Sequence, residues 1–576
     1  MKRIGIIIGA VCVVAAGAYF LATTRLAKVT GADFLPTEIL VTLEQRDLGP
    51  LLDDFKVSRL GLAVAGIDYV KIATDLGRTP EEIDQVRDGK KQLENFLNSP
   101  VFREFFGQEF TIGLLPLPDL ALDAPEKSVR SSLLFIARPQ HNTDILEMMT
   151  TLFAKKMEQT SIQHGKHSLK QYRVEEGTTL TAVIVDGFVI AAFDERLVQA
   201  SLDRYDSKQG SLSQNQEYIR LRQELIDAKL FAYVSMPVLS KQTSRLTETL
   251  DSAQKEGLQQ AVDQWQGWEG MAFGAWKEKG MVRDKGVVLF KKDKLAPLVA
   301  KMCSVKPVEN KTLAMIPANI LGYYWSNTLN MSAFWEMFTQ EMKDDAEQLA
   351  AMEKSVKSST GLELQQIFAM FGSEAVFLLK DIAAEGFIPL PNGAIFLQLT
   401  KEDEFSTMAQ ALLAKADIPI QTEEYKGVKL NSLGMALHPS LQPVYGVHQG
   451  YLIMAGTVDL VKKIIDNQAG GSGSLLMGEA GFQQINQGLN QGLTKANNSV
   501  SFVKFSALLQ MMKELANWGG TMLAMQDPET ANQAKVMIEQ LIHPLFDGLA
   551  MYEVVGSRSV IQDDAIILES STTLAQ

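Results

Sequence analysis

Apolar residues along the chain follow the two spacings that distinguish strands from helices. Short apolar runs at residues 110–115 and 131–137 are bounded by turn-forming residues, which predicts buried strands. Residues 142–157 place apolar side chains at i, i+3, i+4, i+7 and i+8, which is one face of an amphipathic helix. Residues 33–65, before these runs, show strand-like alternation.

Local signals indicate where several elements begin and end. Thr79, Pro80 and Glu82 form a capping box at the start of a helix that we expect to run toward Leu97. Asp186-Gly187 lies between apolar runs and predicts a β-hairpin, because these residue types supply positive φ angles. Further elements are predicted as a helix at 195–204, a strand at 230–234, a long helix carrying Leu258, Ala261, Val262 and Trp265 on one face, and closing strands at 271–276 and 287–290.

The same order of motifs occurs twice. Phe106-Gly107-Gln108-Glu109 returns as Phe371-Gly372-Ser373-Glu374, and the strand-to-helix stretch 187–198 returns as 450–461. The other matches in the same order are 35–40 with 316–321, 145–153 with 405–413, Asp203 with Asp466, and 270–290 with 548–568 without a gap. Six matches in one order predict an internal duplication.

The second half repeats the predicted elements with one difference. It keeps a helix at 458–467, a strand at 499–505 and closing strands at 549–555 and 565–568, but its long helix is expected to break at Gly519-Gly520 and at Asp527-Pro528. Hairpins combined with helices laid on a sheet predict an α+β fold with a mainly antiparallel sheet in each of two homologous domains. The expected organisation is an anchor and tether at 1–30, a first domain at 31–300, a linker at 292–311 and a second domain at 312–576.

Composition and charge narrow the possible partners. The chain has 576 residues, a net charge of −13 and 46% hydrophobic residues, which is typical of a globular protein. We find no basic stripe and no interleaving of aromatic and basic residues, so nucleic acid is not expected as a partner.

The N-terminus predicts a single-pass membrane anchor. Residues 4–22 are uncharged, and Lys2-Arg3, Arg25 and Lys28 flank them. The alternative is a cleaved signal peptide with Ala16-Gly17-Ala18 as the cleavage site, but the apolar run continues past that site. A lipoprotein is disfavoured because Val11 precedes Cys12 where a small residue is required. The two surviving interpretations both place the body outside the cytoplasm.

Candidate chemistry is sparse. His164 and His167 are spaced like metal ligands, but no third ligand is placed by the sequence, so a solvated turn is preferred. The glycine-rich stretch 470–474 lacks the Gly-Lys-Ser/Thr ending of a phosphate-binding loop. Ser501 and Lys504 match the spacing of serine acyl-enzymes, but they lie in a strand-like stretch that sends them to opposite faces.

Four acidic residues recur in the two halves and are the only candidate site residues. These repeated polar positions are Glu109 with Glu374 and Asp203 with Asp466. They mark either a carboxylate in each of two equivalent sites or hydrogen bonds at a turn and at a helix end, and the second interpretation is preferred. Cys303 has no second cysteine nearby and is expected to be a small apolar residue. Methionines such as Met148, Met149, Met511 and Met512 fill cores by default, although an apolar cleft between two amphipathic halves is an alternative.

The chain resembles an uncharacterised bacterial envelope family of unknown function. The resemblance rests on Leu35-Pro36, on the Phe-Gly-x-Glu turn at 106–109, on 187–198 and on the strand near 231–234, and it covers most of 34–290 and 315–568. It implies an N-terminal transmembrane segment in the inner membrane and a periplasmic or otherwise extracytoplasmic body. It carries over no catalytic residue.

These observations lead to one expectation and two alternatives. We expect a non-enzymatic, membrane-anchored envelope protein that binds or scaffolds, without catalytic residues, metal or cofactor, and with an envelope protein or a lipid as partner. The alternatives are a membrane-tethered carrier of lipid or another hydrophobic ligand and, third, an enzyme of unrecognised type. An exposed apolar groove would favour the carrier, a flat patch a protein partner and a polar pocket the enzyme.

Overall fold

A computed structural model describes residues 29–117, 125–139, 159–175, 178–247, 252–383, 389–416, 419–433, 441–468 and 475–575. The predicted anchor at 4–22, the predicted helix at 142–157 and the glycine-rich stretch 470–474 lie outside these residues. Across the described ranges, no helix combines the length and the apolar composition that a membrane span requires.

The chain forms two compact units that do not coincide with the two sequence halves. Unit 1 contains Met1–Gly49, Phe96–Gln223 and Ala232–Thr249, and unit 2 contains Pro50–Asn95, Glu224–Phe231 and Leu250–Gln576. Several segments of the first half therefore fold together with the whole second half.

Unit 1 is built on an antiparallel sheet. Its strand order is β8 (Leu230–Ser235, of which 232–235 belong to this unit), β1 (Val41–Arg46), β2 (Glu109–Leu114), β3 (Leu133–Arg138), β7 (Phe188–Ala192), β6 (Thr178–Val185), β5 (His167–Glu175) and β4 (Gln159–His164). Helix α9 (Glu195–Ser207) packs on β6 and β7. The other helices of this part are α6 (Pro100–Phe105), α7 (Pro125–Ser131), α10 (Gln216–Glu224) and α11 (Met236–Thr247).

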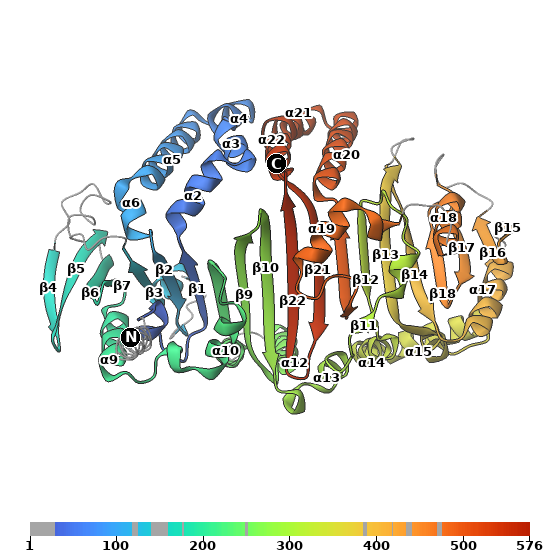
Figure 1. Ribbon diagram of the computed structural model, residues 1–576, viewed down its shortest axis with the longest axis horizontal. Coiled ribbons are helices and arrows are strands. Elements are labelled where there is room, and N and C mark those ends of the chain that lie inside the picture. The colour runs from blue at the N-terminus through green and yellow to red at the C-terminus, as the bar shows by residue number, and fades with distance from the viewer. Residues whose placement is uncertain are drawn as a thin grey trace, which may run out of the picture. The chain divides into compact units, whose positions relative to one another are not determined.

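Unit 2 contains a longer antiparallel sheet (Figure 1). Its strand order is β9 (Trp268–Glu278), β10 (Met281–Phe290), β22 (Ala565–Leu574), β21 (Tyr552–Ile561), β20 (Ser499–Val503), β12 (Gly322–Ser326), β13 (Phe371–Ala383), β14 (Leu390–Leu399), β18 (Tyr451–Ala455), β17 (Val444–His448), β16 (Val428–Leu433) and β15 (Ile420–Tyr425). A separate pair joins β11 (Val308–Glu309) to β19 (Ala496–Asn497).

Helices from both sequence halves belong to unit 2. The helices from the first half are α2 (Leu48–Val57), α3 (Arg59–Gly66), α4 (Tyr69–Asp75), most of α5 (Pro80–Asn98), and α12 (Ser252–Gln264). The later helices are α13 (Pro297–Met302), α14 (Met331–Glu341), α15 (Ala346–Thr360), α16 (Leu364–Phe368), α17 (Glu402–Ala416), α18 (Val458–Gln468), α19 (Ala480–Gly488), α20 (Phe505–Gln526), α21 (Pro528–Met537) and α22 (His543–Leu549).

The strand order of the first half recurs in the second. The series β8–β1–β2–β3–β7–β6–β5–β4 has the same connections as β20–β12–β13–β14–β18–β17–β16–β15. Small details recur as well, because Leu212 donates its backbone N–H to the Leu35 carbonyl at 2.8 Å and Leu476 donates to the Ile316 carbonyl at 3.0 Å. This is the arrangement expected of a duplicated fold.

The last strand of each half pairs with the other inside unit 2. β10 and β22 are both ten residues long and run antiparallel, with Lys285 opposite Glu569 at the middle of the ladder. Lys285 and Glu569 hold the same position counted from the start of their strands. A local two-fold axis that relates β10 to β22 therefore passes between these two residues. Because β10 (281–290) corresponds to β22 (565–574), the gapless sequence match of 270–290 with 548–568 is displaced by six residues. Gly548 lies in α22, whereas Gly270 lies in β9.

Two other element predictions were wrong. Strand-like alternation at 33–65 gives only β1, because Asp47 adopts a φ of 54° and Pro50 then lies in the first turn of helix α2. The predicted break at Gly519-Gly520 does not occur, since α20 continues through both glycines. A Cβ at Gly520 would lie 3.2 Å from Ile538 Cδ1, so this glycine permits close helix packing.

Predictions that rest on specific local chemistry were confirmed. Helix α5 begins with the expected capping box, in which Glu82 accepts from the Thr79 backbone at 2.9 Å and Thr79 accepts from the Glu82 backbone at 3.3 Å. Asp186 and Gly187 form the hairpin turn with φ angles of 48° and 79°. Asp527 ends α20 and caps α21.

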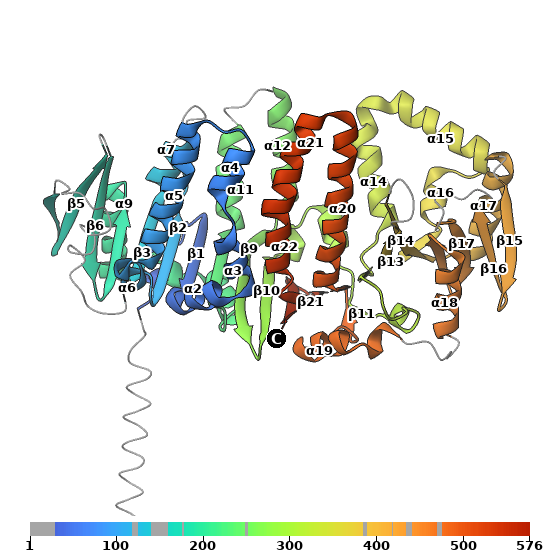
Figure 2. The same cartoon turned by 90° about the horizontal axis from the view of Figure 1, so that it is seen from above.

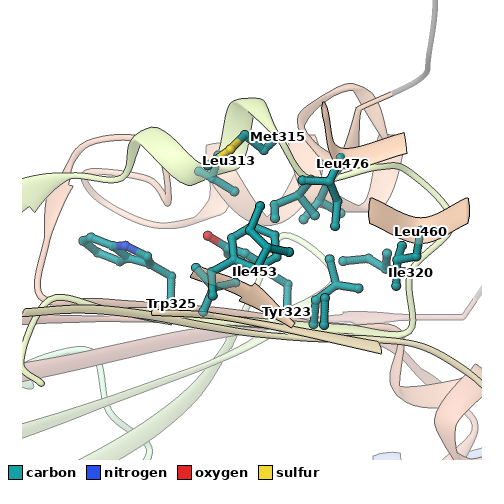
Figure 3. Close-up of a cluster of buried hydrophobic side chains, with 14 of the residues drawn as sticks. Leu313, Met315, Ile320, Tyr323, Trp325, Ile453, Leu460 and Leu476 are labelled. Carbon is teal, nitrogen blue, oxygen red and sulfur yellow. The ribbon is translucent and has the colours of Figure 1, made fainter. Parts of the chain in front are cut away.

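One face of the unit 2 sheet carries the main core. Trp325, Tyr323 and Ile453 project from this face and meet Leu460 of α18 and Leu476 (Figure 3). Helix α19 packs on β21 and β22 on the same sheet. Helices α20, α21, α12 and α14 project on the side of the sheet opposite α19 (Figure 2). The side chains that the strands direct toward the side of these helices form the second face of the sheet.

Candidate functional site

The repeated aspartates each tie a helix to a neighbouring β-hairpin. Asp203 on α9 lies 2.7 Å from His164 Nε2 at the β4–β5 turn. Asp466 on α18 accepts from Tyr425 at 2.9 Å and pairs with Lys426 Nζ at 2.6 Å at the β15–β16 turn. These hydrogen bonds from Lys426 and Tyr425 hold the pKa of the Asp466 carboxyl below its usual value. Both aspartates therefore occupy equivalent bracing positions.

The repeated glutamates also bond within the fold. Glu109 opens β2 and accepts from the Gly31 backbone N–H at 3.2 Å. Glu374 in β13 accepts from Trp325 Nε1 and from the Tyr451 hydroxyl, each at 2.9 Å. Burial, followed by the charge of Glu374, raises the pKa of Tyr451, so this phenol stays protonated at neutral pH.

The two histidines contact different carboxylates. His164 meets Asp203, whereas His167 Nε2 lies 3.0 Å from Asp206, which also pairs with Lys166 at 3.0 Å. Within the part of the chain that the structure describes, no group of three or more His, Cys, Asp or Glu is arranged to hold a metal ion.

The remaining candidates for nucleophilic chemistry, Ser501 with Lys504 and Cys303, are engaged in other contacts. The Ser501 hydroxyl lies 2.7 Å from that of Ser557, while Lys504 pairs with Glu479 at 2.8 Å. Cys303 is buried beside Phe290 and Leu295, and burial raises the pKa of its thiol. A protonated, buried thiol is a poor nucleophile.

The second face of the unit 2 sheet exposes a row of large apolar side chains, which we call the open face. Tyr324 lies opposite Phe377 in the β12–β13 ladder, and Phe377 lies opposite Ile395 in the β13–β14 ladder. Their exposed fractions are 42%, 49% and 37%. The Tyr324 and Phe377 rings lie 6.3 Å apart between centroids. A second apolar group on this face consists of Met271, Phe273 and Leu568, which are also exposed.

Hydroxyl groups separate the two apolar groups of the open face. Ser499 meets Ser559 at 2.6 Å and Ser501 meets Ser557 at 2.7 Å across the β20–β21 pair. Ser570 of β22 donates to Asp284 of β10 at 2.6 Å. The face thus combines aromatic and aliphatic contacts with a stripe of short polar side chains.

Sequence reasoning missed the open face. Strands β13 and β14 contain uninterrupted apolar runs, such as residues 375–379 and 394–397, so alternation could not tell which side was buried. Uninterrupted apolar runs are typical of strands covered on both faces. In this sheet, the second face stays partly uncovered, since Tyr324, Phe377 and Ile395 are exposed.

Comparisons with known proteins place the chain in a family without giving it a role. No curated protein matches the sequence. Among solved structures, crystal form I of TP0453 matches with a TM-score of 0.24, 10% identity, and coverage of 47% of this chain and 82% of that chain. Crystal form III matches with a TM-score of 0.22, 8% identity, and coverage of 48% and 85%. Likeness at this level indicates neither a shared fold nor a shared role.

A family model described as "Protein of unknown function (DUF3352)" matches residues 81–407, more than half of the sequence. The chain therefore belongs to this family of unknown function, as its motifs predicted.

Proposed function

We propose that this protein is a non-enzymatic binding or scaffolding protein of the bacterial cell envelope. Residues 4–22 hold it in the inner membrane, and its body lies in the periplasm. The observation that carries the binding role is the exposed row of Tyr324, Phe377 and Ile395 on the open face. Large apolar side chains that stay exposed in a contiguous group usually mark an interaction surface.

The chemistry of the open face favours a protein partner over a lipid. Aromatic side chains are enriched at protein interfaces, and short hydroxyls such as those of Ser499 and Ser501 adapt their hydrogen bonds to a partner. A lipid needs a site that covers most of its surface. Tyr324 and Phe377 lie opposite each other on neighbouring strands of one sheet and are partly exposed, so they form a patch on the surface of the sheet and do not enclose a ligand.

The absence of enzyme activity is supported by the state of the repeated acids. Glu374 and Asp466 accept hydrogen bonds from neighbouring side chains, and Glu109 accepts one from the backbone. Asp203 lies within hydrogen-bond distance of His164. Groups committed to bracing the fold in this way are poorly placed to exchange protons with a substrate.

Site-specific photo-crosslinking in intact cells tests the partner. A benzoyl-phenylalanine at Phe377 should crosslink one envelope protein, whereas the same probe at Leu93, which is exposed on α5, should not. With the captured protein purified, Phe377→Ser in the full chain should weaken binding at least tenfold and Leu93→Ser should leave it unchanged. Equal binding by both variants would overturn the open face as the partner surface.

The location has its own test. Protease added to spheroplasts should digest the body and leave a short N-terminal fragment in the membrane. A body that stays intact until the membrane is dissolved would contradict a periplasmic location.

A further inference from the structure

A cavity of about 1040 Å³ lies between α12, α13 and α14 in unit 2, and we call it the linker cavity. Its walls come from two repeats and from the segment that joins them, since α13 lies between η3 (Lys292–Lys294) and β11. This volume is at the upper end of the range of small-molecule sites, which is roughly 300–1,000 Å³.

The counterparts of these helices in the other copy pack on each other. Helix α14 follows β12 as α2 and α3 follow β1, and α12 precedes β9 as α22 precedes β21. The α3–α22 pair packs so closely that a Cβ at Gly548 would lie 2.8 Å from Ala63 Cβ and 2.9 Å from Leu60 Cα. Helices α3 and α22 therefore contact each other directly, whereas α12 and α14 both line the linker cavity.

Helix α13 contributes residues to the lining of the linker cavity. It is fixed to the sheet by Leu295 and Cys303, which are buried with Phe290. It is also fixed to α14, because Lys301 Nζ lies 2.6 Å from Glu336 Oε2. The buried cluster is the main contact that holds α13 in place, because both partners of the Lys301–Glu336 ion pair are about half exposed and such pairs contribute little.

The lining of the linker cavity is amphipathic. Its apolar lining residues include Leu298, Val299, Met302 and Met337. Its polar lining residues are Gln260, Gln264, Gln266, Gln340, Asp263 and Glu336. Among the described residues that line it there is no lysine or arginine, and Lys301 nearby already neutralises Glu336. Asp263 is left as the charge that a ligand would meet at the rim, with Gln259 as its hydrogen-bond donor at 3.0 Å.

We propose that the linker cavity binds a single small amphiphile with an apolar tail and a cationic head group. The tail lies against Leu298, Met302 and Met337, and the head lies at Asp263 among the glutamine amides. Methionine suits such a wall because its flexible thioether adapts to tails of different shape. An anionic head would meet the Asp263 carboxylate, with no lysine or arginine among the described lining residues to balance it, which disfavours it. This site is separate from the open face and does not depend on it.

Photoaffinity labelling of the full chain in native membranes tests the proposal. The probe is decylammonium with a diazirine in its tail, and the labelled peptides are mapped by mass spectrometry. We expect α13 and α14 to be labelled. Excess decylammonium should abolish this labelling, whereas decyl sulfate should compete at least tenfold less effectively. Equal competition by the two detergents, or labelling spread evenly over the chain, would refute the site.

Variants separate cavity binding from partition into lipid. Leu298→Trp and Met337→Trp each fill the apolar wall and should lower labelling of α13 and α14 at least tenfold. Leu62→Trp adds the same ring at an exposed position of α3, away from the linker cavity, and should change nothing. Asp263→Asn keeps the shape of the site, so it should keep tail labelling while removing most of the preference for the cationic head. Full labelling in both tryptophan variants would contradict the proposal.

Discussion

At the scale of single residues, the most unusual group is a carboxylate inside unit 1. Glu44 points from β1 into the core and is 3% exposed. It accepts a hydrogen bond from the Tyr218 hydroxyl, and Arg222 Nε lies 3.5 Å from its second oxygen. Burial raises the pKa of Glu44 more than Arg222 and Tyr218 lower it. Folding therefore disfavours the ionised form of this side chain.

This balance predicts how the stability of unit 1 depends on pH. The pKa of Glu44 is higher in the folded than in the unfolded chain, so its contribution to stability is fully present below the unfolded pKa and is lost as pH rises through the folded pKa. Glu44→Gln cannot titrate. The free energy of unfolding of the wild type relative to this variant should fall as pH rises above the ordinary glutamate value of 4.5. Urea unfolding of both proteins at several pH values measures the difference, and a difference that is constant or rises with pH would contradict the assignment.

At the scale of elements, the two glycines in the middle of α20 have different environments. A Cβ at Gly519 would meet no atom within 4 Å, whereas one at Gly520 would lie 3.2 Å from Ile538 Cδ1 in η7 (Ile538–Ile542), the helical turn before α22. Only the second glycine is needed for packing. The first is an unfavourable residue in a helix interior.

A matched pair of substitutions follows from this contrast. Gly519→Ala should raise the free energy of unfolding by about 0.5–1 kcal/mol, because alanine costs less backbone entropy in a helix. Gly520→Ala should gain less or lose stability, because its methyl group presses on Ile538. Thermal unfolding of the two variants is compared directly. The same response at both positions would mean that α20 does not continue through them as a helix.

Element predictions succeeded where a local signal had a single physical meaning. The Thr79–Glu82 capping box and the Asp186-Gly187 turn each fix hydrogen bonds or φ angles within a few residues, so neighbours in sequence suffice. The predicted break at Gly519-Gly520 was wrong because Gly520 packs against Ile538, a contact with a residue further along the chain that the local sequence does not reveal. The linker cavity was missed for a related reason, since residues 292–311 were predicted only as a linker between the halves, and the cavity is also lined by helices distant in sequence.

At the scale of the whole molecule, the duplicated halves share a compact unit. Residues 50–95, 224–231 and 250–300 belong to unit 2 even though they come from the first half. β10 of the first half forms a ladder with β22 of the second, and α3 packs on α22. The expected domains at 31–300 and 312–576 describe the repeat in the sequence, whereas the compact units cross it. An isolated second half would leave the long edge of β22 unpaired, which favours aggregation.

The halves should therefore stay together when the linker is cut. A protease site inserted after Val305, which precedes β11, can be cleaved in the folded full chain. The β10–β22 ladder and the burial of Ile67 and Ile72 against Val536 should hold the two fragments in one peak on gel filtration. Expressed alone, residues 312–576 should be largely insoluble, and co-expression with 1–305 should restore at least severalfold more soluble protein. Clean separation of the cleaved fragments under native conditions would show that the ladder is not what joins the repeats.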